Sequence, residues 1–399
     1  PVADARDGMG MLCRPVLDQV AAMLPVAAGG TTTTSLSQEN ACAALAGGLR
    51  AFACIMKHVD SFNRSKFAVR NRNALQTVAG AIMQKAWPVI SSVVGAREQL
   101  GPAVSEELFG LLDHLVRSLT PLMGAYVGSV VDAAVGAYQK SLCVAGIVCL
   151  KGVVEMFGAT HAEALRRMFL HLYAPTTRAV GGGEHGDVVE NFFRLVHITG
   201  IRCPEALGPQ ALEWLIPMAT TCSMVKEFDI ARQVLICLSL LLKRPQKSQP
   251  LAAAVDSAMA ANGNGARLAQ VLLEAVVASA PETLVSHHAD VLFHLCRAYP
   301  QGAQQWVYGV LAGVPEEKVA AGVKGQVMTL LFQVVGTGQS VGGRGEARRR
   351  RRFKSILGDL SKICREGRNP ACLLEYTDNT NASPESARRP TTGDVIDLS

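Results

Sequence analysis

The sequence predicts an all-α protein built as an elongated solenoid of helices, and three observations lead to this prediction. Of its 399 residues, 49% are hydrophobic and only 5% are aromatic, a composition that favours closely packed helices over a β-sheet. Apolar residues recur at helical spacing, with almost no strand-like alternation. The chain also exceeds the roughly 250–300 residues at which a single core stops growing, so we expect two domains or one array of repeats.

Two segments display the helical period most clearly. In one, the spacing i, i+4, i+7, i+8, i+11 is occupied by Leu284, His288, Val291, Leu292 and Leu295. In the other, the spacing i, i+3, i+4, i+7, i+10 is occupied by Phe353, Ile356, Leu357, Leu360 and Ile363. Both patterns predict amphipathic helices. The segment Ser141–Phe157 is apolar on nearly all sides, which predicts a helix that neighbouring helices cover on several faces.

Proline and glycine mark the expected helix boundaries. Pro102 precedes one predicted helix, and Pro121 opens another over Leu122–Ala137. The helices fall into antiparallel pairs of ~40 residues, the period of HEAT and armadillo arrays. We therefore expect an α-solenoid superhelix of HEAT-type antiparallel helix pairs over residues 1–376, in which no pair buries its apolar face alone.

Three segments are predicted to be loops, namely Ala27–Ser37, Arg244–Pro250 and Gly336–Glu346. The second of them allows a break in the solenoid near residues 244–250. Residues 377–399 lack the apolar content needed to fold and are predicted to be a disordered tail. Within this tail, Val395–Ser399 resembles a SUMO-interacting motif, although so short a match often arises by chance.

Catalytic motifs are absent from the sequence, so an enzyme is not expected and neither is a cofactor. A P-loop, a GxSxG elbow and an HExxH helix are all missing. The 11 cysteines contain no CxxC pair, which favours reduced thiols. His287 and His294 would lie ~10 Å apart on one helix, too far for one zinc ion. Cys143 and Cys149 fall in an apolar segment, where we expect inert thiols with raised pKa values.

Two charged clusters are candidate partner-binding sites. The acidic cluster is Glu184, Asp187 and Glu190, which either stabilises the start of a helix or meets a basic cargo. The basic cluster comprises Arg348, Arg349, Arg350, Arg351 and Arg352. These arginines are either a solvated loop-to-helix junction or a contact for an acidic or phosphorylated partner, a nucleic acid or an import receptor. No stacking aromatic residues are interleaved with them, which argues against single-stranded nucleic acid.

Several ordered stretches resemble the carboxy-terminal half of importin-β superfamily receptors, in the branch of transportin-SR and its importin-thirteen relatives. They are Leu45–Lys57, Lys85–Ile90, Gln139–Glu155, Glu184–Leu195 and Phe353–Arg365. The resemblance implies a superhelix of HEAT repeats that carries cargo through nuclear pores under control of the small GTPase Ran. It also implies that the chain, which begins at Pro1, is the carboxy-terminal part of a longer receptor whose main Ran-binding surface lies further toward the amino terminus.

Two departures limit what the resemblance implies about cargo. Transportin-SR has an arginine-rich helix for Arg-Ser cargo, whereas the matching stretch Glu106–Thr120 contains only Arg117. The usual His-Pro-Asp reads His185-Gly186-Asp187 here, and the acidic pair that follows it in the family reads Glu190-Asn191. These two changes predict a looser and less acidic loop. The run of arginines is not a feature of the family.

We therefore expect a non-enzymatic, Ran-dependent nuclear import receptor that shuttles between cytoplasm and nucleus and forms part of a cargo-binding arch. The expected partners are basic or Arg-Ser-rich cargo proteins, Ran and nuclear pore proteins, whereas membrane insertion and nucleic acid are not expected. The alternative is a HEAT-repeat scaffold of a multiprotein complex with an arginine-rich contact for an acidic partner or a nucleic acid.

Overall fold

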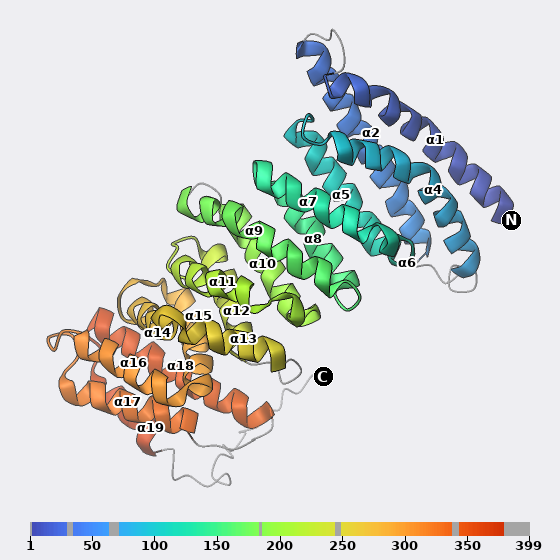
Figure 1. Cartoon of the computed structure of the whole chain (residues 1–399). Helices are drawn as coiled ribbons and strands as arrows, with labels where there is room; N and C mark the ends of the chain where they lie inside the picture. The colour runs from blue at the N-terminus through green and yellow to red at the C-terminus, as the bar shows by residue number, and fades with distance from the viewer. Residues whose placement is uncertain are drawn as a thin grey trace, which may run out of the picture. The chain divides into compact units, whose positions relative to one another are not determined.

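The chain is helical throughout its described part. The computed structural model describes residues 2–29, 35–63, 72–182, 186–243, 249–336 and 343–378. Within these ranges every regular element is a helix and no strand occurs, which confirms the predicted all-α class (Figure 1). Contacts divide the chain into two compact units, Pro1–Asn264 and Gly265–Ser399. This boundary follows the segment 244–250, where the sequence allows a break and of which residues 244–248 lie outside the described ranges.

Helices of the first unit alternate between two layers. One layer contains α1 (Val2–Ala27), α4 (Arg72–Ala96), α7 (Val127–Ser141), α9 (Ala162–Gly182), α11 (Pro209–Cys222) and α13 (Gln249–Ala260). The other contains α2 (Ser35–Asn63), α5 (Pro102–Ser118), α8 (Val144–Phe157), α10 (Gly186–Arg202) and α12 (Phe228–Leu242). In the second layer each helix packs on the next, and consecutive helices also pair across the layers. This is the predicted solenoid of antiparallel helix pairs.

The apolar helix α8 shows why the repeats need one another. It is covered by α5, α7 and α10, and its buried residues are Gly146, Ile147, Cys149, Leu150, Gly152, Val153, Val154 and Phe157. The predicted continuous helix Ser141–Phe157 is wrong in one respect, because Leu142 adopts a left-handed φ of 54° and ends α7. The covering on several faces is confirmed.

The predicted helix over Leu122–Ala137 is also broken. Short elements α6 (Thr120–Met123) and η1 (Gly124–Tyr126) come before α7. Glycine is a poor helix former, so Gly124 offers little resistance to the change of path. The bend lets Tyr126 stack on Trp87 of α4, with ring centroids 4.1 Å apart. Tertiary packing therefore overrides the local helical pattern.

The second unit has a different internal arrangement. Its elements are α14 (Asn264–Glu274), the π-helix η4 (Ala275–Ser279), α15 (Glu282–Ala298), α16 (Pro300–Gly313), α17 (Ala321–Gly336), α18 (Gly343–Glu366), η5 (Pro370–Leu374) and α19 (Glu375–Asp378). Helix α18 packs against η4, α15 and α17. Both periodic patterns expected on α15 and α18 are confirmed, because all ten apolar-face positions are buried.

Helix α18 begins earlier than the sequence predicts. It starts at Gly343, inside the segment Gly336–Glu346 that we expected to be a loop, so the arginine run lies within a helix and not at its junction with a loop. Of the predicted tail, residues 379–399 lie outside the described ranges, and so does the Val395–Ser399 motif.

A search of the described helices for membrane-spanning segments gives one result. None of them is by itself long and apolar enough to cross a membrane, although Pro102–Ser118 and Thr120–Ser141 meet the criteria of length and composition as a pair bent by 112°.

Candidate protein-binding surfaces

The acidic cluster on α10 is engaged locally. Glu184 lies outside the described residues. The Asp187 carboxylate accepts a hydrogen bond of 2.9 Å from the backbone N–H of Val188, as an acidic group in a first helical turn can. Glu190 pairs with Arg194 one turn further along, at 2.5 Å. Both described acids thus have partners on their own helix, and their contact with a basic cargo stays a prediction.

Arg117 links two helices of the second layer. Its Nε donates to Asp113 of α5 at 2.9 Å, and its Nη1 pairs with Glu155 of α8. Burial lowers the pKa of the Arg117 guanidinium, but the hydrogen bonds with Asp113 and Glu155 outweigh burial and raise the pKa. The geometry therefore gives this arginine an intramolecular role between α5 and α8.

The run of five arginines divides into two groups on α18. Arg350 forms a forked pair with Asp290 of α15, with Nε to Oδ1 at 2.5 Å, and Arg352 donates to the carbonyl of Tyr376. In contrast, Arg348 and Arg351 are exposed, and their guanidinium groups make no ion pair within the described part of the chain. Arg349 is half-buried and has a partner of its own. Arg348 and Arg351 are thus the members best placed to meet an external acidic group.

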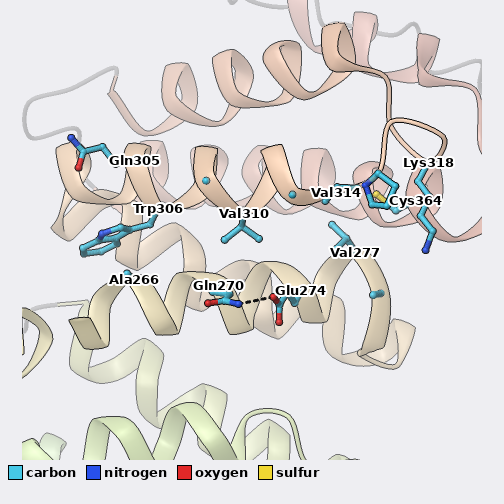
Figure 2. A pocket seen from close by; sticks show the side chains of 14 residues that line it. Ala266, Gln270, Glu274, Val277, Gln305, Trp306, Val310, Val314, Lys318 and Cys364 are labelled. Atoms are coloured by element: carbon cyan, nitrogen blue, oxygen red, sulfur yellow. Dashed lines mark hydrogen bonds between the residues drawn. The ribbon is translucent and has the colours of Figure 1, made fainter. Parts of the chain in front are cut away.

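One feature of the second unit that could accept a partner is a groove between α14 and α16, with a volume of about 560 Å³. It is lined by Ala266, Gln270, Glu274, Val277, Ala278, Gln305, Trp306, Gly309, Val310, Gly313, Val314, Pro315, Lys318 and Cys364. Figure 2 shows Trp306 and Val310 on α16 facing Gln270 and Glu274 of α14, with Lys318 and Cys364 at the end far from Trp306. We call this feature the α14–α16 groove.

Glycine creates the space that the indole of Trp306 occupies. A Cβ added to Gly265 would lie only 2.3 Å from Cη2 of the ring, and one added to Gly302 would lie 3.0 Å from Cζ2. The ring therefore packs directly on the backbone at both glycines. One turn further along α16, Val310 continues the apolar lining, and Val314, which directly follows the last residue of the helix, extends it. Trp306, Val310 and Val314 together form an apolar strip in the groove.

Polar groups are few in the α14–α16 groove. Gln270 donates to Glu274 across one turn at 2.8 Å, and Lys318 supplies a positive charge at the other end. Burial raises the pKa of the Cys364 thiol, which Lys318 and Arg365 lower to a smaller extent. An apolar lining faced by a small number of polar and charged groups is typical of a binding groove.

This groove was not predicted from the sequence. The recurrence of Trp306, Val310 and Val314 at four-residue intervals, next to Gly309 and Gly313, was the available signal. It indicates only an amphipathic helix, because spacing along one helix does not show whether another helix covers the face. Among the described residues, no group of three or more His, Cys, Asp or Glu side chains is placed to hold a metal ion.

Comparison with known proteins supports the fold. No protein-family model and no curated protein matches the sequence. A solved structure of importin 13 in its cytosolic state is similar with a TM-score of 0.54 and 13% identity, over 92% of this chain and 46% of that one. A solved structure of an engineered protein aligns with 92% of this chain and 95% of its own at 12% identity, but its TM-score of 0.38 is too low to indicate a shared fold.

The importin likeness defines the class of architecture. The chain has an importin-like α-solenoid fold of helix repeats, as the sequence predicts, and it spans less than half the length of the importin 13 structure. At 13% identity the likeness concerns the fold alone.

Proposed function

We propose that this chain is part of a non-enzymatic nuclear transport receptor of the importin-β type, which carries protein cargo and shuttles between cytoplasm and nucleus. The observation that carries the proposal is the likeness to importin 13 over 92% of the chain. The ordered motifs that resemble the transportin-SR branch support it from the sequence. Ran would act through a more amino-terminal part of the receptor, and nuclear pore proteins would be further partners.

Stacked helix pairs suit such a role physically. Each pair contacts mainly its neighbours, so small changes at successive interfaces add up over a long array. Such an array can adapt its surface to a folded cargo without a catalytic centre. In the second unit, the α14–α16 groove would contribute an apolar contact with cargo or with a pore protein.

The second candidate function is a scaffold of a multiprotein complex. The exposed pair Arg348 and Arg351 favours it, because guanidinium groups that have no ion-pair partner among the described residues are available to an acidic protein or a nucleic acid. The two functions differ in their response to Ran, since only the receptor should release or recruit partners when GTP-bound Ran is added.

The test is affinity capture of soluble cell proteins on the longest natural form of the polypeptide, with and without GTP-locked Ran. Release of specific proteins by Ran supports import, and recruitment by Ran would indicate export. If the same proteins are captured with and without GTP-locked Ran, the result would contradict the transport-receptor function and favour the scaffold function.

A pair of variants on one helix tests the groove itself. Val310→Asp places a charge in the α14–α16 groove, whereas Tyr308→Asp alters a side chain of the same helix that is 65% exposed and outside the groove. We expect Val310→Asp alone to weaken capture of a Ran-released protein, by about tenfold or more. Equal capture by both variants would remove the groove from the proposed cargo surface.

A further inference from the structure

A second groove lies in the first unit, and its lining includes none of the residues discussed so far as binding sites. It has a volume of about 740 Å³ and is formed by α9, α11 and η3 (Ala261–Gly263). Its lining residues are Tyr173, Thr177, Val180, Gln210, Glu213, Trp214, Pro217, Met218, Thr221, Ala261 and Asn262. We call it the α9–α11 groove.

Two aromatic side chains form part of its lining. Tyr173 of α9 and Trp214 of α11 lie with ring centroids 5.1 Å apart, and Tyr173 is 44% exposed. Trp214 also packs on the buried Phe192, with 5.8 Å between ring centroids, and this contact fixes the position of the indole. A partly exposed, positioned aromatic pair of this kind attracts a cation to its faces.

The charge of the groove has a single sign. Among the described residues, Glu213 is the only charged one in its lining. The Glu213 carboxylate is exposed and makes no ion pair or hydrogen bond within the described ranges of the chain. Arg178, on the neighbouring turn of α9, donates instead to the carbonyl of Gln139 at 3.2 Å. A negative charge without an internal counter-ion therefore stands beside the aromatic pair.

Pro217 adds a hydrogen-bond acceptor to the same wall. Proline has no N–H, so the Glu213 carbonyl loses its usual donor four residues along the helix. Glu213 and Pro217 both belong to the residues that line the groove. At the corresponding position of α9, where Pro175 cannot donate to the carbonyl of His171, that carbonyl accepts a hydrogen bond from the side chain of Gln139 at 3.3 Å.

We propose that the α9–α11 groove binds an arginine side chain presented by a segment of a partner protein. A guanidinium group can stack on Trp214 or Tyr173 while it donates to the Glu213 carboxylate and carbonyl. The flat shape and five donors of arginine suit this combination better than the compact ammonium of lysine. A volume of this size accommodates a short peptide segment around the side chain. This inference depends on the proposed function in one respect only, which is that the arginine belongs to a partner protein.

Peptide binding to the purified full chain tests the assignment. The probe is a fluorescein-labelled heptapeptide, Gly-Ser-Leu-Arg-Leu-Ser-Gly, compared with the same peptide containing citrulline, which keeps the shape of arginine but has no charge. Fluorescence anisotropy gives the ratio of the two dissociation constants. We expect the arginine peptide to bind about tenfold more tightly, because pairing and cation–π attraction both require the charge.

Variants then locate the site. Glu213→Gln keeps the size of the side chain, and Tyr173→Leu removes one aromatic ring at an exposed position. We expect either change to reduce the preference for arginine over citrulline to about threefold or less, while Glu316→Gln, at an exposed site in the other unit, leaves it unchanged. Unchanged circular dichroism verifies that the variants fold.

Two results would overturn the proposal. One is equal affinity of the wild-type chain for the two peptides, and the other is an arginine preference that survives Glu213→Gln. The assay contains no Ran and no cell extract, so its outcome is independent of whether the chain proves to be a transport receptor.

Discussion

At the scale of single residues, the buried carboxylate of Asp290 determines which arginine of α18 is paired within the protein. Asp290 is only 6% exposed and accepts hydrogen bonds from Arg350 and, at 2.8 Å, from Lys354. Burial raises the pKa of the Asp290 carboxyl, but these two hydrogen bonds outweigh burial and hold the pKa below its usual value. Because Arg350 is paired with Asp290, it is not among the arginines of the run that are available to bind a partner.

The lowered pKa of Asp290 predicts a pH-dependent contribution to stability. A carboxyl with a lower pKa in the folded state stabilises the fold above its unfolded pKa of about 3.9, and this contribution is lost as the pH falls through the folded pKa. We expect Asp290→Asn to reduce the free energy of unfolding by about 1–3 kcal/mol at pH 7. The partial exposure of Arg350 favours the lower end.

Urea unfolding at several pH values measures this effect. The difference between wild type and Asp290→Asn should be constant from about pH 5 to pH 7 and should shrink below about pH 4. A difference that does not depend on pH would mean that the aspartate contributes through its shape and not through its charge.

A glycine makes room for the ion cluster between α5 and α8. A Cβ added to Gly152 would lie 2.1 Å from Oδ1 of Asp113, the partner of Arg117. The carboxylate would have to move, so we expect Gly152→Ala to destabilise the chain by about 1 kcal/mol. In an Asp113→Ala background the same substitution should become neutral or stabilising by about 0.5–1 kcal/mol, because alanine is the better helix former. Chemical unfolding of the four proteins gives this comparison, and additive effects would contradict it.

The chemistry of a single residue could be predicted from the sequence where it depends on burial alone. The raised pKa values expected for Cys143 and Cys149 agree with the structure, in which burial raises the pKa of both thiols, and their inertness stays a prediction. The linking role of Arg117 was not predictable, because its partner Glu155 is 38 residues away in the sequence. Likewise, only the fold brings Asp290 to Arg350.

At the scale of elements, the π-helix η4 depends on α18. A π-helix leaves the regular α-helical hydrogen-bond pattern, which often makes carbonyls available to other donors. Arg365 donates to the carbonyls of Ala275 at 2.6 Å and Val276 at 3.0 Å, and Ser361 donates to Val276 at 2.7 Å. One side of α18 thus satisfies the irregular turn that follows α14.

This contact predicts a local loss of stability in the second unit. We expect Arg365→Gln to reduce the free energy of unfolding by about 1–3 kcal/mol, since it removes charge-assisted hydrogen bonds to the carbonyls of Ala275 and Val276. Arg351→Gln, an exposed arginine of the same helix, should change stability by less than about 0.5 kcal/mol.

Hydrogen exchange of the backbone amides locates the effect of Arg365→Gln. Faster exchange should appear in α14 and η4, while the first unit keeps its protection. Equal loss of protection in both units, or equal stability of the two variants, would show that Arg365 does not hold η4 in place.

Helices were predictable from the sequence because their periods are local, but their breaks were not. The patterns on α15 and α18 depend on spacing within one segment, and the structure confirms them. The breaks at Gly124 and Leu142 depend on contacts with other helices, such as that between Tyr126 and Trp87. Both grooves were missed for the same reason, since each requires two helices to be placed side by side.

At the scale of the whole molecule, the two compact units give the chain two cores. Trp87 and Trp214 lie in the first unit and Trp306 in the second. The fraction of surface buried on folding rises with size, so the smaller second unit should be the less stable one. We therefore expect unfolding that is not two-state, with the second unit unfolding at the lower denaturant concentration.

Single-tryptophan variants make this prediction measurable. With the other two tryptophans replaced by phenylalanine, fluorescence from Trp214 follows the first unit and fluorescence from Trp306 follows the second. Non-coincident transitions, with Trp306 changing first, are expected. Adding the destabilising Arg365→Gln should move the Trp306 transition to lower denaturant and leave the Trp214 transition in place, because that contact lies wholly in the second unit. Coincident transitions that shift together would instead mean that the repeats unfold as one cooperative array, as tight coupling between neighbouring repeats allows.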